Sequence, residues 1–268
     1  MKIKFNIDRN GCLYSFSSTD DHCEVIEEFI IPSKIKGREV SSIGELEHSF
    51  SKLKDHGVKR IKKIKIEDGI REVQDWAFAN IEIEIDELHW PVSCENISPC
   101  CFDNTPLKAI KGIEHVKGIG DFAFARTNLK TITWPSDCEK IPKRCFFNTP
   151  LEGIKGIEHV KKIGICAFAR TNLKTITWPS DCEKIPYNCF ENSSLEEIIF
   201  SNYRGIKDID LYNLYSFIYL SGNNIKKIDL SSADAVNLIR GHSDVDYKKL
   251  YERMKGLLRL PYYVNGLE

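Results

Sequence analysis

Apolar residues recur at fixed offsets along most of this chain. Counted from Leu129 as zero, apolar or small residues stand at offsets 0, 3, 5, 9, 12, 16 and 17: Leu129, Ile132, Trp134, Cys138, Ile141, Cys145 and Phe146. The same offsets fit units that begin at Ile61 and Ile85, although those units share little else with the first. The pattern therefore indicates a structural rule, and it predicts about six or seven units of 22 residues.

Two neighbouring blocks of the chain are near copies. Cys101–Arg144 and Cys145–Asn188 agree at 36 of 44 positions, and "ARTNLKTITWPSDCEKIP" occurs unchanged at 125–142 and 169–186. Offset 5 alternates between large and small residues through Trp90, Gly112, Trp134, Gly156 and Trp178. Strands of one sheet lie about 4.8 Å apart, so indoles on successive units would crowd, and we predict a 44-residue packing repeat. A recent duplication explains the identical surface residues more simply than two selected binding sites.

Each unit has the composition of a short strand followed by a return segment. "LKTITWP" is β-branched or apolar at alternate positions and ends in a proline, which suits a strand. A unit of 22 residues cannot bury its apolar side alone, whereas stacked units can, which predicts a solenoid with a parallel sheet along one face. Stacking also predicts a continuous phenylalanine column of Phe78, Phe102, Phe124, Phe146, Phe168 and Phe190.

The two ends of the chain depart from this pattern. Ile3, Phe5 and Ile7 alternate with polar residues before Asn10–Gly11, which predicts an N-terminal β-hairpin cap over residues 1–24. The repeats are expected over 25–200, and the remainder, 201–268, is expected to hold irregular repeats and a helical cap. The predicted short C-terminal helix lies in 243–261, with Ser243 as its N-cap and Leu250, Met254, Leu257 and Leu258 on one face.

The repeat text resembles a known family. "LKTITWPSDCEKIPKRCF", "LKTITWPSDCEKIPYNCF" and "VKKIGICAF" resemble the BspA-like class of leucine-rich repeats, and "IIPSKIKGREVSSIG" looks like the opening unit of such proteins. "YSFIYLSGNNIKKIDL" resembles a more ordinary leucine-rich repeat, with Tyr215, Ile218, Leu220, Asn223 and Ile225 at the matching offsets. The resemblance implies an α/β repeat solenoid that is right-handed, mostly β and loop, and without enzymatic activity.

Composition narrows the class of partner and the location. The net charge of −1, from 38 basic and 39 acidic residues, does not favour a nucleic-acid binder with a broad basic surface. No apolar run reaches the roughly 18 residues of a membrane span, so no membrane insertion is expected. If Met1 is the natural start, the absence of an export signal predicts a cytoplasmic protein. If a leader was removed, the alternative that the resemblance implies is a secreted or cell-surface protein.

The cysteine and histidine side chains are interpreted as structural, with no catalytic or metal-binding role. Cys94, Cys138 and Cys182 share offset 9, and Cys101, Cys145 and Cys189 share offset 16, where other units carry Val, Ile or Ala, so we expect buried thiols. Cys12 and Cys23 allow a disulfide if the protein is exported. His115 and His159 are equivalent and are expected in solvated turns, too far apart to share a metal ion. The chain contains no nucleophile elbow, P-loop, dinucleotide fingerprint or HExxH sequence, so no catalytic, cofactor or metal residue is assigned.

The outward positions of the predicted strands, offsets 2 and 4, are the candidate partner-binding face. We expect a non-enzymatic scaffold that binds a protein through this face; the alternative is a surface adhesin or structural surface protein. The candidate residues are Lys63, Lys65, Glu87, His89, Lys111, Thr131, Thr133, Lys155, Thr175, Thr177 and Glu197.

Overall fold

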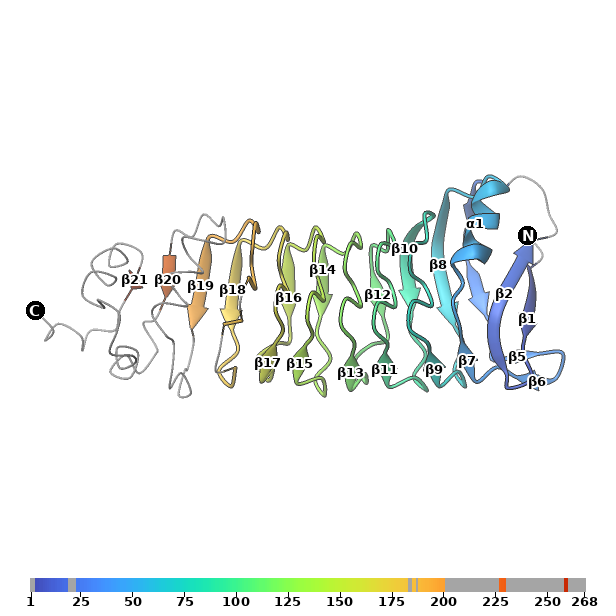
Figure 1. Ribbon diagram of the computed structural model, residues 1–268, viewed down its shortest axis with the longest axis horizontal. Helices are drawn as coiled ribbons and strands as arrows, with labels where there is room; N and C mark the ends of the chain where they lie inside the picture. Colours follow the sequence, from blue (N-terminus) through green and yellow to red (C-terminus); the bar gives the residue numbers. More distant parts are fainter. Residues whose placement is uncertain are drawn as a thin grey trace, which may run out of the picture.

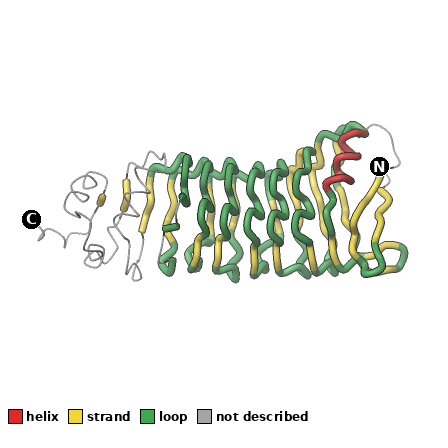
Figure 2. Tube along the Cα trace, in the orientation of Figure 1, coloured by secondary structure: helices red, strands yellow, loops and turns green. Residues whose placement is uncertain are grey.

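The computed structural model describes residues 3–18, 23–182, 185–186, 188–200, 227–229 and 258–259. The described chain is an elongated stack of short strands and loops, with strand β1 near one end and the repeats following along the long axis (Figure 1). Loops connect successive strands throughout, and the described part holds one helix, close to the N-terminal end (Figure 2).

The predicted N-terminal hairpin is confirmed. Strands β1 (Ile3–Ile7) and β2 (Cys12–Ser18) pair antiparallel, with Phe5 opposite Phe16. The Asp8 carboxylate accepts hydrogen bonds from the backbone N–H groups of Asn10 and Cys12, at 2.8 and 2.9 Å. Gly11 adopts φ +81°, which a glycine adopts without strain.

A short helix follows the hairpin and was not anticipated from the sequence. Helix α1 (Glu47–Asp55) buries Phe50 and Leu53, and Leu46 just before it is buried as well. The hydroxyl of Ser49 accepts a hydrogen bond from the Phe16 N–H, and the Phe16 and Phe50 rings meet edge to face at 4.9 Å. The helix therefore fastens the hairpin to the first repeat.

The predicted parallel sheet is present as a row of strands along the stack. Strands β3 (Val25–Ile26) and β4 (Phe29–Ile31) both pair with β8. Strand β8 pairs on its other side with β10, and β10 pairs with β12. Separate ladders then join β14 to β16 and β18 through β21. The other strands are β8 (Arg60–Ile66), β10 (Glu84–His89), β12 (Ile110–Lys111), β14 (Thr131–Thr133), β16 (Gly153–Lys155), β18 (Thr175–Trp178), β19 (Glu197–Phe200), β20 (Lys227–Asp229) and β21 (Leu258–Arg259).

A second row of two-residue strands runs beside the first, whereas the repeat pattern predicted a sheet on one face only. Parallel ladders join β2 to β7 and β9, β11 to β13, and β15 to β17, as Figure 1 shows along the lower edge. The row consists of β7 (Ser42–Ile43), β9 (Glu72–Val73), β11 (Asn96–Ile97), β13 (Gly118–Ile119), β15 (Lys140–Ile141) and β17 (Lys162–Ile163). A small antiparallel pair, β5 (Lys34–Ile35) and β6 (Arg38–Glu39), lies near the hairpin.

Six-residue turns form a third row, which we call the turn edge: 75–80, 99–104, 121–126, 143–148, 165–170 and the described part of the sixth, 188–192. The second and sixth residues of each turn have positive φ, for example Phe122 (+60°) and Arg126 (+55°). Backbone N–H groups of one turn donate to carbonyls of the next, as Phe124 does to Cys145 at 3.1 Å. Backbone hydrogen bonds therefore join successive repeats at this edge too.

The phenylalanine column is confirmed as the centre of the core. All six predicted rings, from Phe78 to Phe190, are fully buried. Neighbouring rings stack with centroids 5.3 to 5.8 Å apart. Buried threonines add polar support, because the hydroxyls of Thr127 and Thr149 donate to the Phe124 carbonyl, both at 2.9 Å.

The tryptophan–glycine alternation has a different cause from the one expected. A Cβ at Gly112 would lie 2.7 Å from the Trp90 carbonyl oxygen, and one at Gly156 would lie 2.9 Å from that of Trp134. Both glycines also have positive φ, +75° and +74°. Glycine is thus needed for the backbone, while each indole N–H donates to the carbonyl four residues on, as Trp134 does to Cys138. Pairing of β10 with β12 and of β14 with β16 agrees with a 44-residue unit.

Most C-terminal expectations lie outside the described residues. These are the ordinary repeat around Tyr215 to Ile225 and the helix in 243–261. At Leu258–Arg259 the helix prediction is wrong, because these residues form strand β21 paired with β20. The right-handed sense of the coil and the domain boundaries stay predictions.

Candidate functional site

The main row of strands brings the predicted face residues into register. Glu87 lies opposite Lys63, and His89 lies between Lys65 and Lys111 on the two flanking strands. Further along, Thr131 and Thr133 lie opposite Gly153 and Lys155, and Thr175 lies opposite Glu197. The structure therefore places the candidate residues in neighbouring positions within each ladder.

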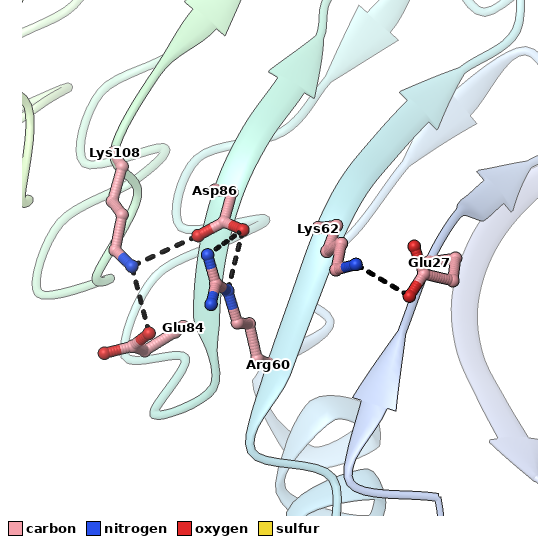
Figure 3. A network of polar contacts seen from close by, with 6 residues as sticks. All are labelled: Glu27, Arg60, Lys62, Glu84, Asp86 and Lys108. Atoms are coloured by element: carbon pink, nitrogen blue, oxygen red, sulfur yellow. Dashed lines mark hydrogen bonds and ion pairs between the residues drawn. The ribbon is translucent and has the colours of Figure 1, made fainter.

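The N-terminal part of this face is a ladder of alternating charge. Residues 24–28 and β10 are acidic, whereas β8 and Lys108, two residues before β12, are basic. Figure 3 shows Asp86 between two cations: Arg60 lies at 2.6 Å and Lys108 at 3.1 Å. Lys108 also reaches Glu84 at 3.0 Å, and Lys62 pairs with Glu27 at 2.8 Å. Opposite charges on neighbouring strands support the parallel pairing.

This ladder takes up three of the candidate binding residues. Lys63 pairs with Glu28 at 2.7 Å, and this hydrogen bond lowers the pKa of the Glu28 carboxyl. The Glu87 carboxylate contacts Nε2 of His89, two residues along the same strand. These side chains therefore have partners inside the protein, which the sequence pattern did not reveal.

Other candidates remain accessible. Lys65, Lys111 and Lys155 are exposed and take part in none of the ion pairs among the described residues. All three stand at offset 4, in one column with Thr133 and Thr177. We call Lys65, Lys111 and Lys155 the lysine column; Thr131, Thr133, Thr175 and Thr177 are exposed beside it.

The turn edge carries a group of residues whose contacts the repeat pattern did not predict. The Arg144 guanidinium lies over the rings of Phe122 and Phe147, at 5.5 and 5.6 Å, and Arg170 lies over Phe147 at 5.3 Å. Such contacts stabilise by electrostatic attraction between cation and ring. The signal available in the sequence was that Phe122, Arg144 and Phe147 occur where the two copies differ.

The cysteine columns are structural, as predicted. Cys94, Cys138 and Cys182 are buried, and Cys101, Cys145 and Cys189 are fully buried. Burial raises the pKa of the Cys101, Cys145 and Cys189 thiols well above the ordinary value. It also raises the pKa of Cys100 to about 11. These thiols are therefore protonated and unreactive at neutral pH. Cys12 and Cys23 are free thiols.

The two equivalent histidines are half-buried, whereas solvated turns were expected. His115 lies 3.2 Å from the Cys94 carbonyl through Nε2, and Nε2 of His159 is buried without a hydrogen-bond partner. Among the described residues, no group of three or more His, Cys, Asp or Glu side chains is arranged to hold a metal ion. The described part likewise contains no helix long and apolar enough to cross a membrane.

Comparison with known proteins decides the family. A profile described as "BspA type Leucine rich repeat region (6 copies)" matches residues 14–152 and 139–240. The chain belongs to the BspA-type leucine-rich repeat family. No catalytic family is indicated, and members of the BspA type are generally protein-interaction scaffolds. A search of curated proteins finds no match to this BspA-type chain.

Solved structures similar to this BspA-type protein are bacterial leucine-rich repeat proteins. One from Bacteroides ovatus is 19% identical with a TM-score of 0.42, covering 85% of this chain and 70% of that one. One from Eubacterium ventriosum is 15% identical with a TM-score of 0.35, covering 88% and 68%. The T. pallidum leucine-rich repeat protein is 12% identical with a TM-score of 0.32, covering 63% and 86%.

Proposed function

We propose that this protein is a non-enzymatic scaffold that binds a protein partner through the main row of strands. The observation that carries the proposal is the lysine column, whose three exposed ammonium groups form no ion pair within the described protein. Lys62 and Lys63 of β8, on the same row of strands, do form ion pairs. Family membership supports the same class of function.

The column has a regular geometry. His89 lies in register between Lys65 and Lys111, so these two lysines are two strands apart. Neighbouring strands are about 4.8 Å apart, which separates their backbones by roughly 10 Å. Exposed threonines of β14 and β18 supply hydroxyl donors and acceptors along the same face. We propose that the partner presents carboxylates to the lysines and polar groups to the threonines, with charge complementarity speeding association.

A charge reversal tests this proposal. Lys111→Glu combined with Lys155→Glu should lower recovery of the partner in a quantitative pull-down from source cells by at least about tenfold, because like charges across an interface cost several kcal/mol. The matched control is Lys140→Glu with Lys162→Glu, which changes the same charge at two exposed lysines of the second row. Equal recovery by the face variant and the wild type would reject the proposal.

The alternative function, a surface adhesin, would use the same face. It differs from the scaffold in location, because an adhesin meets its partner outside the cell. Protease treatment of intact source cells separates the two: an adhesin would be digested from outside, whereas a cytoplasmic scaffold would stay intact until lysis. We propose the cytoplasmic scaffold as the first hypothesis to be tested in this way.

A further inference from the structure

The two near-identical blocks differ in an uneven way. Of the eight first-copy residues that change in the second, five lie in turns: Asp103, Asp121, Phe122, Lys143 and Arg144. The first copy has 14 exposed residues, and Lys143 is the only one of them that changes. Neutral drift should fall first on exposed positions, where substitutions have the least effect on stability. The differences between the copies therefore concentrate at the turn edge.

One of these changes removes a counter-charge. Arg126 and Arg170 are equivalent residues of the two copies. In the first copy, the Arg126 guanidinium forms an ion pair with the buried carboxylate of Asp103. In the second copy Phe147 replaces this aspartate, and Arg170 lies over its ring instead. The exchange converts an internally neutralised arginine into one without an anion.

A second arginine joins the first at the same ring. Arg144 stacks on Phe147 and on Phe122, and its Nε is buried with no hydrogen-bond partner. Within the described residues neither Arg144 nor Arg170 forms an ion pair. Two guanidinium groups thus flank Phe147 with their charges uncompensated. Guanidinium is weakly hydrated and matches a carboxylate in a two-point geometry, so it is well suited to bind one.

The backbone conformation at Arg144 and Arg170 is unfavourable for a residue with a side chain. Arg144 and Arg170 have φ of +52° and +58°, in the left-handed region. This conformation costs most residues about 1–2 kcal/mol and is tolerated best by Gly and Asn. Asparagine indeed occupies the position equivalent to Arg144 in the next copy, Asn188, and the positions equivalent to Arg170 in the turns before and after it, Asn148 and Asn192. Asparagine stands at the sixth position of four of the six turns, so folding alone does not explain Arg170. At the second position, where Arg144 lies, Trp76, Cys100, Phe122 and Cys166 adopt the same left-handed conformation in other turns.

An apolar surface lies beside these arginines. The Arg144 N–H donates to the carbonyl of Ile165, whose side chain is 47% exposed. Phe122 and Phe147 are half-buried and present part of their rings. Exposed aromatic and arginine side chains are the types most enriched at the energetic centres of protein interfaces.

We propose that the turn edge between Phe122 and Arg170 is a second docking surface, and that its occupant is an acidic segment of a partner protein. Carboxylates of that segment pair with Arg144 and Arg170. Its apolar side chains cover Phe122, Phe147 and Ile165. This surface is separate in its residues from the lysine column, so either can fail without the other.

The test uses substitutions that the chain itself contains at equivalent positions. Arg144→Asn with Arg170→Asn removes both charges and relieves the left-handed backbone, so the melting temperature should not fall. Random 12-residue peptides displayed on phage are selected on the wild-type protein, and the selected peptides are measured by fluorescence anisotropy. We expect peptides with Asp or Glu beside Leu or Phe, and at least about tenfold weaker binding to the double variant, because charge-assisted two-point hydrogen bonds are lost.

Two controls complete the experiment. The lysine-column variant, Lys111→Glu with Lys155→Glu, should bind the selected peptides as the wild type does. Replacing Asp and Glu of a selected peptide with Asn and Gln should abolish its binding. The proposal is overturned if the selection yields no peptide, if the peptides are neutral or basic, or if the arginine variant binds them as tightly as the wild type.

Discussion

The main row of strands has two regions with the same backbone pairing and different surfaces. From residue 24 to β12, which we call the charged region, acidic and basic segments alternate, and six ion pairs link them. These are Lys59–Glu24, Lys62–Glu27, Lys63–Glu28, Arg60–Asp86, Lys108–Glu84 and Lys108–Asp86. In β14 and β18 the outward residues are Thr131, Thr133, Thr175 and Thr177, and the ion pair described there is Lys130–Glu152, at 3.5 Å.

The comparison separates what the repeat requires from what it leaves free. Phe102 of the first region and Phe146 of the second are both fully buried and stacked on both sides at 5.6 to 5.8 Å. The core is therefore common to both regions. The surface differs because neither cross-strand ion pairs nor exposed threonines affect the packing below them.

Removing a core ring should have the largest effect, and the same effect in both regions. Phe102→Ala and Phe146→Ala should each lower the free energy of unfolding by about 3–5 kcal/mol, because each leaves a cavity inside the stack. Urea unfolding followed by circular dichroism measures this loss, with Phe→Leu at each site as the milder control. A difference above about 1 kcal/mol between the two alanine variants would contradict a common core.

The sequence was sufficient for the core because the core depends on residue type at fixed spacing. The offsets counted from Leu129 predicted buried positions such as Ile132, Cys138 and Ile141, and the structure buries all of them. Helix α1 was missed since its apolar residues Leu46, Phe50 and Leu53 follow helical spacing outside the repeat pattern.

Side-chain pairing could not be predicted from the period. Arg60 lies opposite Glu84 in the strand register, yet its guanidinium pairs diagonally with Asp86. The turn edge was also hidden, because Arg126 and Arg170 are identical in sequence context over 18 residues. Their difference comes from Asp103 and Phe147, which lie 23 residues earlier and become neighbours through stacking.

Alanine in place of the backbone glycines should have the next largest effect. Gly112→Ala and Gly156→Ala place a Cβ within 2.7 and 2.9 Å of a tryptophan carbonyl at positive φ. We expect each to lower the free energy of unfolding by about 2–4 kcal/mol, from left-handed strain plus overpacking. Gly112 follows β12, where the alternating charges end, and Gly156 follows β16, beyond them, so similar losses would extend the common architecture to the backbone.

Gly37→Ala is the matched control for these glycines. Gly37 has φ +81° and no atom within 4 Å of its Cβ position, so this variant reports the left-handed strain alone, about 1 kcal/mol. If Gly37→Ala were as destabilising as Gly112→Ala, the contact with the Trp90 carbonyl would not be the reason for the alternating glycines.

The smallest expected effect on stability distinguishes the ion-paired surface around Asp86 from the threonine surface of β14 and β18. Burial opposes ionisation of Asp86, but hydrogen bonds from Arg60 and Lys108 outweigh it and lower the pKa of its carboxyl. A carboxyl whose pKa falls on folding stabilises the protein above its unfolded pKa of about 3.9, and this stabilisation is lost as the pH drops through the lower, folded value.

Asp86→Asn should therefore lower the free energy of unfolding by about 0.5–1 kcal/mol at pH 7 and by progressively less below pH ~4. Thr133→Ala in the duplicated region should change it by less than about 0.5 kcal/mol at every pH. Unfolding measured from pH 3 to 7 checks both, and a pH-independent loss for Asp86→Asn would show that its ion pairs do not stabilise the charged region.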